Sequence, residues 1–186
     1  MSTSISEIEK WLPFEATFYM SEIVPVSDEA MSQLSKEEKR EFELCKSQKR
    51  QQEFVTSRIT FKKIVGKKEG GQDFKILKDE LGQPFGKTDT HKYFVSIAHS
   101  DNFVFCGLSG EHAIGVDLEP VDRAVHAKLE QRIIHPEETE IVTEIPLIRL
   151  WTIKEAYIKL RGQGLRMNMN EVKIERESDW IFAEIN

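Results

Sequence analysis

The sequence predicts an α+β fold built from two similar α/β lobes. Strand-like and helix-like segments come in separate blocks, and the order strand, helices, strands is followed by strands, helix, strands. The two halves are roughly similar, and we place the division near Ser109. This gives an N-terminal lobe of residues 1–108 and a C-terminal lobe of residues 109–186. A chain of 186 residues is long enough for one large domain or for two small lobes sharing a core.

Strands are predicted where short runs of β-branched and aromatic residues are bounded by turn residues. Two of these runs flank the short turn "SGEH" (109–112) and together favour a hairpin. The stretch "LGQPFGKTDT" (81–90) is rich in turn residues and separates two other strands. The predicted strands are residues 17–20, 74–77, 93–98, 103–108, 113–118, 171–175 and 180–185.

Helices are predicted where apolar residues recur at helical spacing between capping signals. Ser35 with Glu38 three residues later forms a capping box. Pro146 suits the first turn of a helix, and Gly162 and Gly164 suit its end. The predicted helices are two between Ser35 and Val65 with a break near residues 46–50, one at 126–134 and one at 146–160; "GKKEGG" (66–71) is the expected stop after Val65.

Composition excludes several classes of protein. Hydrophobic residues make up 39% and charged residues 31%, as in ordinary soluble globular proteins, and the net charge of −6 argues against nucleic-acid binding. No run approaches the ~18 apolar residues of a membrane span, and "MSTSISEIEKWLPF" lacks the pattern of a secretory signal. Cys45 and Cys106 have no metal-type spacing. They indicate free thiols in a reducing cytosol, so we expect a cytoplasmic protein with no membrane partner.

Three locally basic segments stand out in this acidic chain: residues 45–52, 58–68 and 154–166. Such segments can bind phosphate or an acidic partner. Solvated helix faces would give the same pattern, so both interpretations stay open.

Residues 113–123, "AIGVDLEPVDR", place two carboxylates one residue apart. On a strand, Gly115, Asp117 and Glu119 would face one way, and Pro120 would end the strand beside them. Mg²⁺ prefers one or two carboxylates together with waters and substrate phosphates. The pattern therefore suits either half of a magnesium site or an ordinary solvent-facing strand edge.

Two further patterns bear on chemistry. Glu155 and Lys159 lie at i and i+4 and would share a helix face with Trp151; alone, this fits a surface ion pair of ~0.3–0.5 kcal/mol. His99 follows the strand-like "FVSIA", where an imidazole could hold a phosphate or simply bond to a loop.

Taken together, these patterns resemble the 4'-phosphopantetheinyl transferases. The family motifs G-(V/I)-D-x-E and W-(S/T)-x-K-E-(A/S)-x-x-K occur in order after "SIAHS", and the resemblance covers about residues 45–170. Because the first motif lies deep in the chain, the sequence is similar to the larger, monomeric, pseudo-two-fold, surfactin-synthetase-activating class rather than the short trimeric class. The matching residues are Gly115, Asp117, Glu119, Trp151, Thr152, Lys154, Glu155, Ala156 and Lys159.

The resemblance implies roles for individual residues. It assigns Mg²⁺ binding to Asp117, Glu119 and Glu155, and catalysis to Glu155 and Lys159. Lys159 would touch the phosphate, and His99 would approach the 3'-phosphate of coenzyme A. The coenzyme A contacts that it implies are Lys49, Arg50, Arg58, Gln83, Pro84, Ser96, Ala98, His99, Lys154 and Lys159.

The sequence departs from the family pattern at three places. Ala98 replaces the serine before the histidine, and Gln83 replaces the lysine of a G-K-P turn. The sequence ends at "WIFAEIN", earlier than a full second lobe suggests, so we expect a closing strand to be absent or supplied by a partner subunit.

The activity implied is Mg²⁺-dependent transfer of 4'-phosphopantetheine from coenzyme A to a serine of an apo acyl or peptidyl carrier protein, with release of 3',5'-ADP. This chemistry serves secondary-metabolite or fatty-acid biosynthesis. Glu155 would take the serine proton directly or through a water on the metal, and both routes stay open. The N-terminal lobe would hold the nucleotide and, through residues 45–50 and 58–68, dock the acidic carrier.

Two other functions are compatible with the sequence. A catalytically weakened relative would bind coenzyme A or a carrier protein without transfer. A different Mg²⁺-dependent phosphodiesterase would need further carboxylate or histidine ligands, and the sequence has no such cluster.

Overall fold

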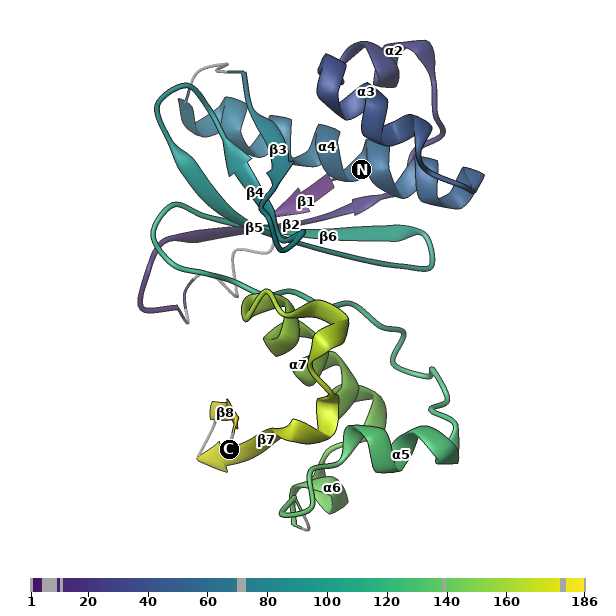
Figure 1. The fold of residues 1–186 in the computed structure, drawn as a ribbon, viewed down its shortest axis with the longest axis vertical. Helices are drawn as coiled ribbons and strands as arrows, with labels where there is room; N and C mark the ends of the chain where they lie inside the picture. The colour runs from purple at the N-terminus through teal and green to yellow at the C-terminus, as the bar shows by residue number, and fades with distance from the viewer. Residues whose placement is uncertain are drawn as a thin grey trace. The chain divides into compact units, whose positions relative to one another are not determined.

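The structure is a computed structural model, and it describes residues 2–4, 10, 12–69, 73–138, 140–177 and 180–185. The chain forms two compact units, Met1–Ile114 and Gly115–Asn186, called the first and second unit below (Figure 1). Both combine helices with antiparallel strands, as an α+β fold requires. The expected boundary after residue 108 falls inside the last strand of the first unit.

The first unit is organised around one antiparallel sheet. Its six strands follow the order β1-β2-β6-β5-β4-β3, so the second strand of this unit, β2, pairs with its last strand, β6, and β1 lies at one edge of the sheet. Residues 94–100 of the long β5 pair with the whole of β6, with Phe94 opposite Ser109 and Ser100 opposite Phe103. The strands are β1 (Ser2–Ser4), β2 (Ala16–Glu22), β3 (Lys75–Lys78), β4 (Pro84–Lys87), β5 (Lys92–Ser100) and β6 (Phe103–Ser109).

Among the residues that the structure describes, three helices complete the first unit: α2 (Asp28–Ser32), α3 (Lys36–Glu43) and α4 (Gln48–Glu69). The capping box at the start of α3 is confirmed, because Ser35 Oγ accepts from Glu38 N and Glu38 Oε2 accepts from Ser35 N. Residues 53–61 of α4 are all buried, since one side packs on the sheet and the other on α2. Figure 1 shows α4 lying along the sheet.

The second unit is smaller. Its helices are α5 (Ala127–Ile133), α6 (Ile141–Glu144) and α7 (Leu147–Leu160), and its strands are β7 (Val172–Glu177) and β8 (Trp180–Ile185). β7 and β8 form an antiparallel pair with Val172 opposite Ile185. Ile133 of α5, Leu150 of α7 and Ile174 of β7 lie in one core, which fixes α7 between the other elements.

Most predicted elements are confirmed, and four details of the prediction are wrong. Residues 113–118 do not pair with β6 as a hairpin; β6 pairs with β2 and β5 instead. The turn-rich stretch 81–90 contains β4, whose Pro84 is tolerated as the first residue of a strand. α4 continues through Gly66 to Glu69, and β5 continues through His99 to Ser100. Of the predicted stop at residues 66–71, residues 66–69 belong to α4, and residues 70 and 71 lie outside the described residues.

Two findings concern the wider setting of the chain. No described helix is both long and apolar enough to cross a membrane. Cys45 and Cys106 are both free cysteines, as predicted.

Candidate functional site

The segment after β6 approaches the backbone of α7 more closely than a side chain would allow. A Cβ atom placed on Gly115 would lie 1.9 Å from the carbonyl oxygen of Ala156 and 2.8 Å from the amide nitrogen of Leu160. Glycine is therefore required at position 115 for this approach. The contact also explains why residues 113–118 form no hairpin, because the segment packs on α7 rather than on a strand.

The predicted alternation along this segment is kept without a strand partner. Ile114 and Val116 are buried, whereas Asp117 and Glu119 retain some exposure. The apolar residues anchor the segment, and the carboxylates face the side where α7 carries its own polar residues.

Helix α7 begins and ends where the sequence predicts. Pro146 is its N-cap residue, and Gly162, with a φ of 66°, follows its C-terminal residues in the left-handed conformation that glycine adopts freely. The buried face of α7 carries Leu150, Lys154 and Ile158, spaced one helical turn apart.

Lys159 of α7 binds the first-motif segment directly. Its Nζ donates to Asp117 Oδ1 at 2.7 Å and to the carbonyl oxygen of Val116 at 3.1 Å. The Asp117 side chain is only 9% exposed, and its second oxygen, Oδ2, is buried with no hydrogen-bond partner among the described residues. A buried carboxylate oxygen left without a partner is costly, so this atom has an unmet capacity to bind a donor or a cation.

Glu155 lies within electrostatic reach of both first-motif carboxylates. Burial raises the pKa of Glu155 above its ordinary value, and the Asp117 carboxylate raises this pKa further, with a smaller contribution from Glu119. The Lys159 ammonium acts in the opposite direction and lowers the pKa of Glu155. Glu155 and Lys159 of the second motif therefore both interact with carboxylates of the first motif, Glu155 electrostatically and Lys159 by a direct hydrogen bond.

Two cations of the chain already neutralise part of this negative charge. Lys159 binds Asp117, and Arg123 binds Glu119 while its guanidinium lies 5.4 Å from the centre of the Trp151 ring. Among the residues that the structure describes, no three His, Cys, Asp or Glu side chains converge as a metal-ligand group. The donor set still suits Mg²⁺, because carboxylate oxygens are its preferred protein ligands and Asp117 Oδ2 has no hydrogen-bond partner in the part of the chain that the structure describes.

An open pocket of about 590 Å³ adjoins these residues in the second unit. Glu155 and Lys159 form part of its wall, next to the indole ring of Trp151. The remaining apolar wall comes from Leu129, Ile133, Ile158, Met167 and Met169. A substrate group placed here would contact Glu155 and Lys159, and the polar residues Arg132, Asn168 and Asn170 also line the pocket.

Lys154 does not reach this site, which corrects its assignment as a phosphate contact. Its side chain is completely buried, and Nζ lies 2.6 Å from both Glu138 Oε2 and the carbonyl oxygen of Ile133. Burial lowers the pKa of Lys154, and Glu138 opposes that effect. The ammonium is thus part of the interior of the second unit.

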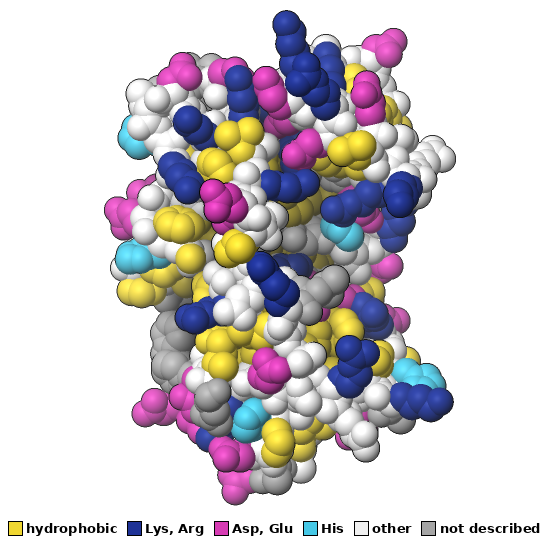
Figure 2. All heavy atoms as spheres, viewed as in Figure 1, with side chains coloured by type: hydrophobic (Ala, Val, Ile, Leu, Met, Phe, Trp, Pro, Cys, Tyr) yellow, Lys and Arg dark blue, Asp and Glu magenta, His cyan; other side chains and the backbone are white. Residues whose placement is uncertain are grey.

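In the first unit, the structure brings Arg50 and His99 together. Arg50 Nη1 lies 2.5 Å from His99 Nε2 and 3.2 Å from Glu53 Oε2, and His99 Nδ1 lies 3.3 Å from Glu53 Oε1. Lys49 is exposed one residue earlier on α4. Figure 2 shows several Lys and Arg side chains on the visible face of the first unit. These groups offer an accessible basic surface.

Three other residues assigned to coenzyme A are buried inside the first unit. Arg58 is 5% exposed, donates to Glu41 Oε2 at 3.3 Å and lies over the Phe54 ring; burial lowers the pKa of its guanidinium. Ser96 and Ala98 are 4% and 2% exposed. Their side chains therefore lack the surface exposure that a direct ligand contact needs, which corrects these assignments.

The turn predicted to lie near the nucleotide connects β3 and β4. Asp79 Oδ1 accepts from the amides of Leu81 and Gln83, and Pro84 begins β4. The turn is held by the Asp79 side chain, as expected for an aspartate that folds the backbone back on itself.

Two residues near the site were missed by sequence reasoning. Arg123 lies four residues after Glu119 in a loop, where no periodic pattern marks it. Glu138 could have been sought, because Lys154 lies one turn from Leu150 and one turn from Ile158, and a lysine on a buried helix face requires an anionic partner.

Comparison with known proteins agrees with these motifs. The family model described as "4'-phosphopantetheinyl transferase superfamily" matches residues 113–184. The chain is 32% identical over 106 residues to 4'-phosphopantetheinyl transferase gsp of Aneurinibacillus migulanus, covering 53% of this chain and 43% of gsp. It is 31% identical over 87 residues to 4'-phosphopantetheinyl transferase HetI of Nostoc sp., covering 42% of this chain and 36% of HetI.

A shorter relative is covered more fully. The chain is 33% identical over 78 residues to the holo-(acyl-carrier-protein) synthase of Staphylococcus carnosus, covering 38% of this chain and 67% of that protein. The chain therefore belongs to the 4'-phosphopantetheinyl transferase superfamily. It spans less than two thirds of the length of gsp and of HetI.

Proposed function

We propose that the protein transfers 4'-phosphopantetheine from coenzyme A to a serine of an apo acyl or peptidyl carrier protein, with Mg²⁺, and releases 3',5'-ADP. The observation that carries the proposal is the grouping of Asp117, Glu119 and Glu155 with Lys159, inside the segment that matches the superfamily model. The names of the relatives, a transferase and a holo-carrier-protein synthase, support the same reaction.

The three carboxylates would hold Mg²⁺, and the unpartnered Asp117 Oδ2 is the oxygen that gains most from a cation. When bound, Mg²⁺ would neutralise the coenzyme A pyrophosphate and favour attack at phosphorus. The chain's own residues supply the rest of the site, and their roles follow from position and charge.

Lys159 would pair with the charge that develops on the leaving 3',5'-ADP, because its ammonium already lies at the edge of the carboxylate group and remains 31% exposed. Glu155 would accept the proton of the carrier serine. Its burial and its two anionic neighbours increase its affinity for a proton, which is the property required of such a base.

The nucleotide end of coenzyme A would bind the first unit. Arg50 and His99 present nitrogen atoms beside one another at an exposed position, which suits a phosphate monoester. Lys49 and the turn at Gln83 and Pro84 are further contacts in this proposal. Basic residues of segments 45–50 and 58–68 that reach the surface would receive the acidic carrier.

We assign the protein to the larger, monomeric, pseudo-two-fold class of the superfamily. A unit of helices and antiparallel strands precedes the first motif, and a second such unit carries both motifs. Both cysteines are thiols, which supports action in the reducing cytoplasm.

The test incubates the protein with coenzyme A, Mg²⁺ and several apo carrier proteins, and then measures carrier masses. The expected result is a phosphopantetheine mass gain on at least one carrier. If the protein binds coenzyme A but modifies none of the carriers, it is a catalytically weakened relative that binds without transfer. Ala98 and Gln83, where the family has serine and lysine, favour this alternative.

Replacement of the carboxylates tests the site itself. Asp117→Ala and Glu155→Ala should each reduce transfer more than about 100-fold, because loss of residues that merely support metal ligands already costs about 10–100-fold. Asp122→Ala, at an exposed position of the same segment, is the matched control and should retain activity. Full activity of either site variant would show that the metal site is misassigned.

A further inference from the structure

We propose that the buried ion pair between Lys154 and Glu138 is a positioning device that fixes the rotation of α7 and thereby the place of the Glu155 carboxylate. This inference rests on the proposed function, since it concerns how the carboxylate group is assembled. It gives Lys154 a role that requires no contact with substrate.

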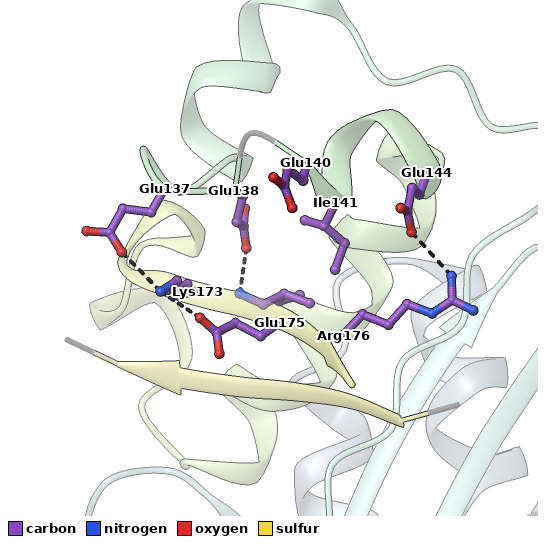
Figure 3. Close-up of a pocket in the computed structure, with 9 residues that line it drawn as sticks. Glu137, Glu138, Glu140, Ile141, Glu144, Lys173, Glu175 and Arg176 are labelled. Carbon is purple, nitrogen blue, oxygen red and sulfur yellow. Dashed lines mark hydrogen bonds and ion pairs between the residues drawn. The ribbon is translucent and has the colours of Figure 1, made fainter. Parts of the chain in front are cut away.

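Glu138 is bound from three directions. Its Oε2 accepts from Lys154 Nζ at 2.6 Å and from the amide of His135 at 2.8 Å, and its Oε1 accepts from the amide of Ile174 at 2.7 Å. Figure 3 shows Glu138 reaching from the connection between α5 and α6 toward the backbone of β7. Lys154 adds the carbonyl oxygen of Ile133 in α5 at 2.6 Å. One charged pair thus ties α7 to α5, to β7 and to the loop between α5 and α6.

These bonds restrain α7 in a way that apolar packing does not. The neighbours of Lys154 on the buried face, Leu150 and Ile158, make contacts that tolerate sliding and rotation, because the hydrophobic effect has no direction. The two short bonds of Nζ have fixed partners and fixed lengths. They select one rotational setting of the helix.

The required accuracy is high enough for such a device to matter. Side chains on a helix reach about 6 Å from its axis, so a rotation of about 15° would move the Glu155 carboxylate by about 1.5 Å. A working site tolerates displacements of only about 0.5 Å. Glu155 directly follows Lys154 in the sequence, so any rotation of α7 at Lys154 is transmitted to it.

Stability alone does not account for the pair. Burying two charges carries a desolvation cost, and well-packed apolar residues in place of a buried pair are often equally stable. An apolar pair in place of Lys154 and Glu138 could therefore leave the second unit equally stable. What an apolar substitute lacks is the directional restraint.

Neighbouring ion pairs provide a matched control. Lys173 of β7 lies 3.1 Å from Glu137 and 2.7 Å from Glu175, and all three residues line the pocket drawn in Figure 3. These glutamates are well exposed, in contrast to Glu138, and the pairs link β7 to itself and to the loop after α5. Removal of Lys173 takes away a lysine–glutamate pair from the same region without touching α7.

The experiment compares wild type, Lys154→Met, the double variant Lys154→Met/Glu138→Gln, and Lys173→Met. The double variant removes both charges together, so no uncompensated buried charge remains. Mn²⁺ affinity is measured by electron paramagnetic resonance in the presence of coenzyme A, well below each unfolding temperature. kcat and KM for coenzyme A are measured with a carrier that the wild type modifies.

We expect Mn²⁺ affinity and kcat to fall about 10–100-fold in the double variant, the usual effect of losing support behind metal ligands. The KM for coenzyme A should stay unchanged, and Lys173→Met should match the wild type. A folded double variant with wild-type Mn²⁺ affinity and kcat would overturn the positioning role. So would a double variant that cannot fold, because the pair would then be a requirement of the fold rather than of the site.

Failure of the proposed function gives a different result. If the wild type itself neither binds Mn²⁺ nor modifies a carrier, the reaction assignment fails, and the positioning role falls with it. If the wild type binds Mn²⁺ and modifies a carrier, and the double variant does so with the same Mn²⁺ affinity and kcat, only the positioning role fails.

Discussion

In the part of each long helix whose burial the structure describes, one Lys or Arg side chain is buried, and the two cations are held in different ways. Arg58 of α4 is 6% exposed and lies near Glu38 and Glu41. Lys154 of α7 is completely buried and has a single carboxylate partner, Glu138. The family resemblance implied that both residues contact coenzyme A, and the structure places both in the interior.

The difference lies in how many partners share the charge. Glu38 is bound by Lys62 Nζ at 2.6 Å and by the amide of Ser35, whereas Arg58 Nε is 4.0 Å from Glu38 Oε1, and neither of these two buried atoms has a hydrogen-bond partner among the described residues. In the second unit, both oxygens of Glu138 accept hydrogen bonds. In the first unit, two cations lie near Glu38, yet Glu38 Oε1 and Arg58 Nε are left without hydrogen bonds among the described residues. In the second unit, both oxygens of Glu138 are hydrogen-bonded, and the cation is Lys154.

The largest expected effect is therefore that of Lys154→Met. It leaves the buried Glu138 carboxylate without its cation, and breaking a buried pair on one side costs about 3–5 kcal/mol. The free energy of unfolding, measured by urea titration, should fall by that amount. Lys173→Met, in the same region, should change it little; an equal loss in both variants would contradict the comparison.

A smaller but related effect is expected at the contact between the two motifs. Gly115→Ala would place a methyl group 1.9 Å from the carbonyl oxygen of Ala156, and neither backbone can yield without moving the carboxylates. Overpacking of this kind costs about 1–3 kcal/mol, and we expect about 3 kcal/mol because the clash is with backbone. Urea unfolding measures the loss. Unaltered stability and transfer activity would show that α7 and the motif segment can separate freely.

Arg58→Met should cost less than Lys154→Met, about 1–2 kcal/mol, because Lys62 remains bound to Glu38 and Glu41 is partly exposed. The same variant separates an interior arginine from a ligand contact. The KM for coenzyme A should be unchanged, whereas Arg50→Ala, at the exposed end of the same helix, should raise it. A raised KM in Arg58→Met would restore its assignment to the nucleotide.

The sequence predicted what depends on short-range pattern. The capping box at Ser35 and the limits of α7 follow from spacings of a few residues, and so does the placing of Glu155 and Lys159 on neighbouring turns of α7. The family motifs added the long-range link between the carboxylate segment and α7. The periodicity of apolar residues cannot predict that link, because the link depends on how residues 113–119 and α7, which are distant in sequence, pack together.

What could not be predicted depends on burial and on partners distant in sequence. Lys154 and Arg58 look like surface cations in a linear motif, and only their tertiary surroundings show that Glu138 and Glu41 hold them inside. The hairpin at 103–118 was predicted from β-propensity, but Gly115 allows the segment to pack on a helix instead. Propensity for strands yields to tertiary packing in such cases.

The smallest expected effect comes from the first unit and has the opposite sign. Gly66 lies within α4, and a Cβ added there would meet no atom within 4 Å. Alanine is favoured over glycine in a helix by up to about 1 kcal/mol. We expect Gly66→Ala to raise the free energy of unfolding by about 0.5 kcal/mol, because Gly66 lies near the end of α4.

Gly164→Ala is the matched control for this gain. The space around its Cβ is equally open, but its φ of 52° is a conformation that alanine adopts only with strain. Its free energy of unfolding should therefore fall by about 1 kcal/mol or more, whereas that of Gly66→Ala rises. Urea titrations of both variants measure the two changes. If the free energy of unfolding rose in both variants, open space around the Cβ atom alone would decide whether alanine is tolerated. Gly115 would then differ from these two glycines only in its steric contacts, and backbone conformation would contribute nothing.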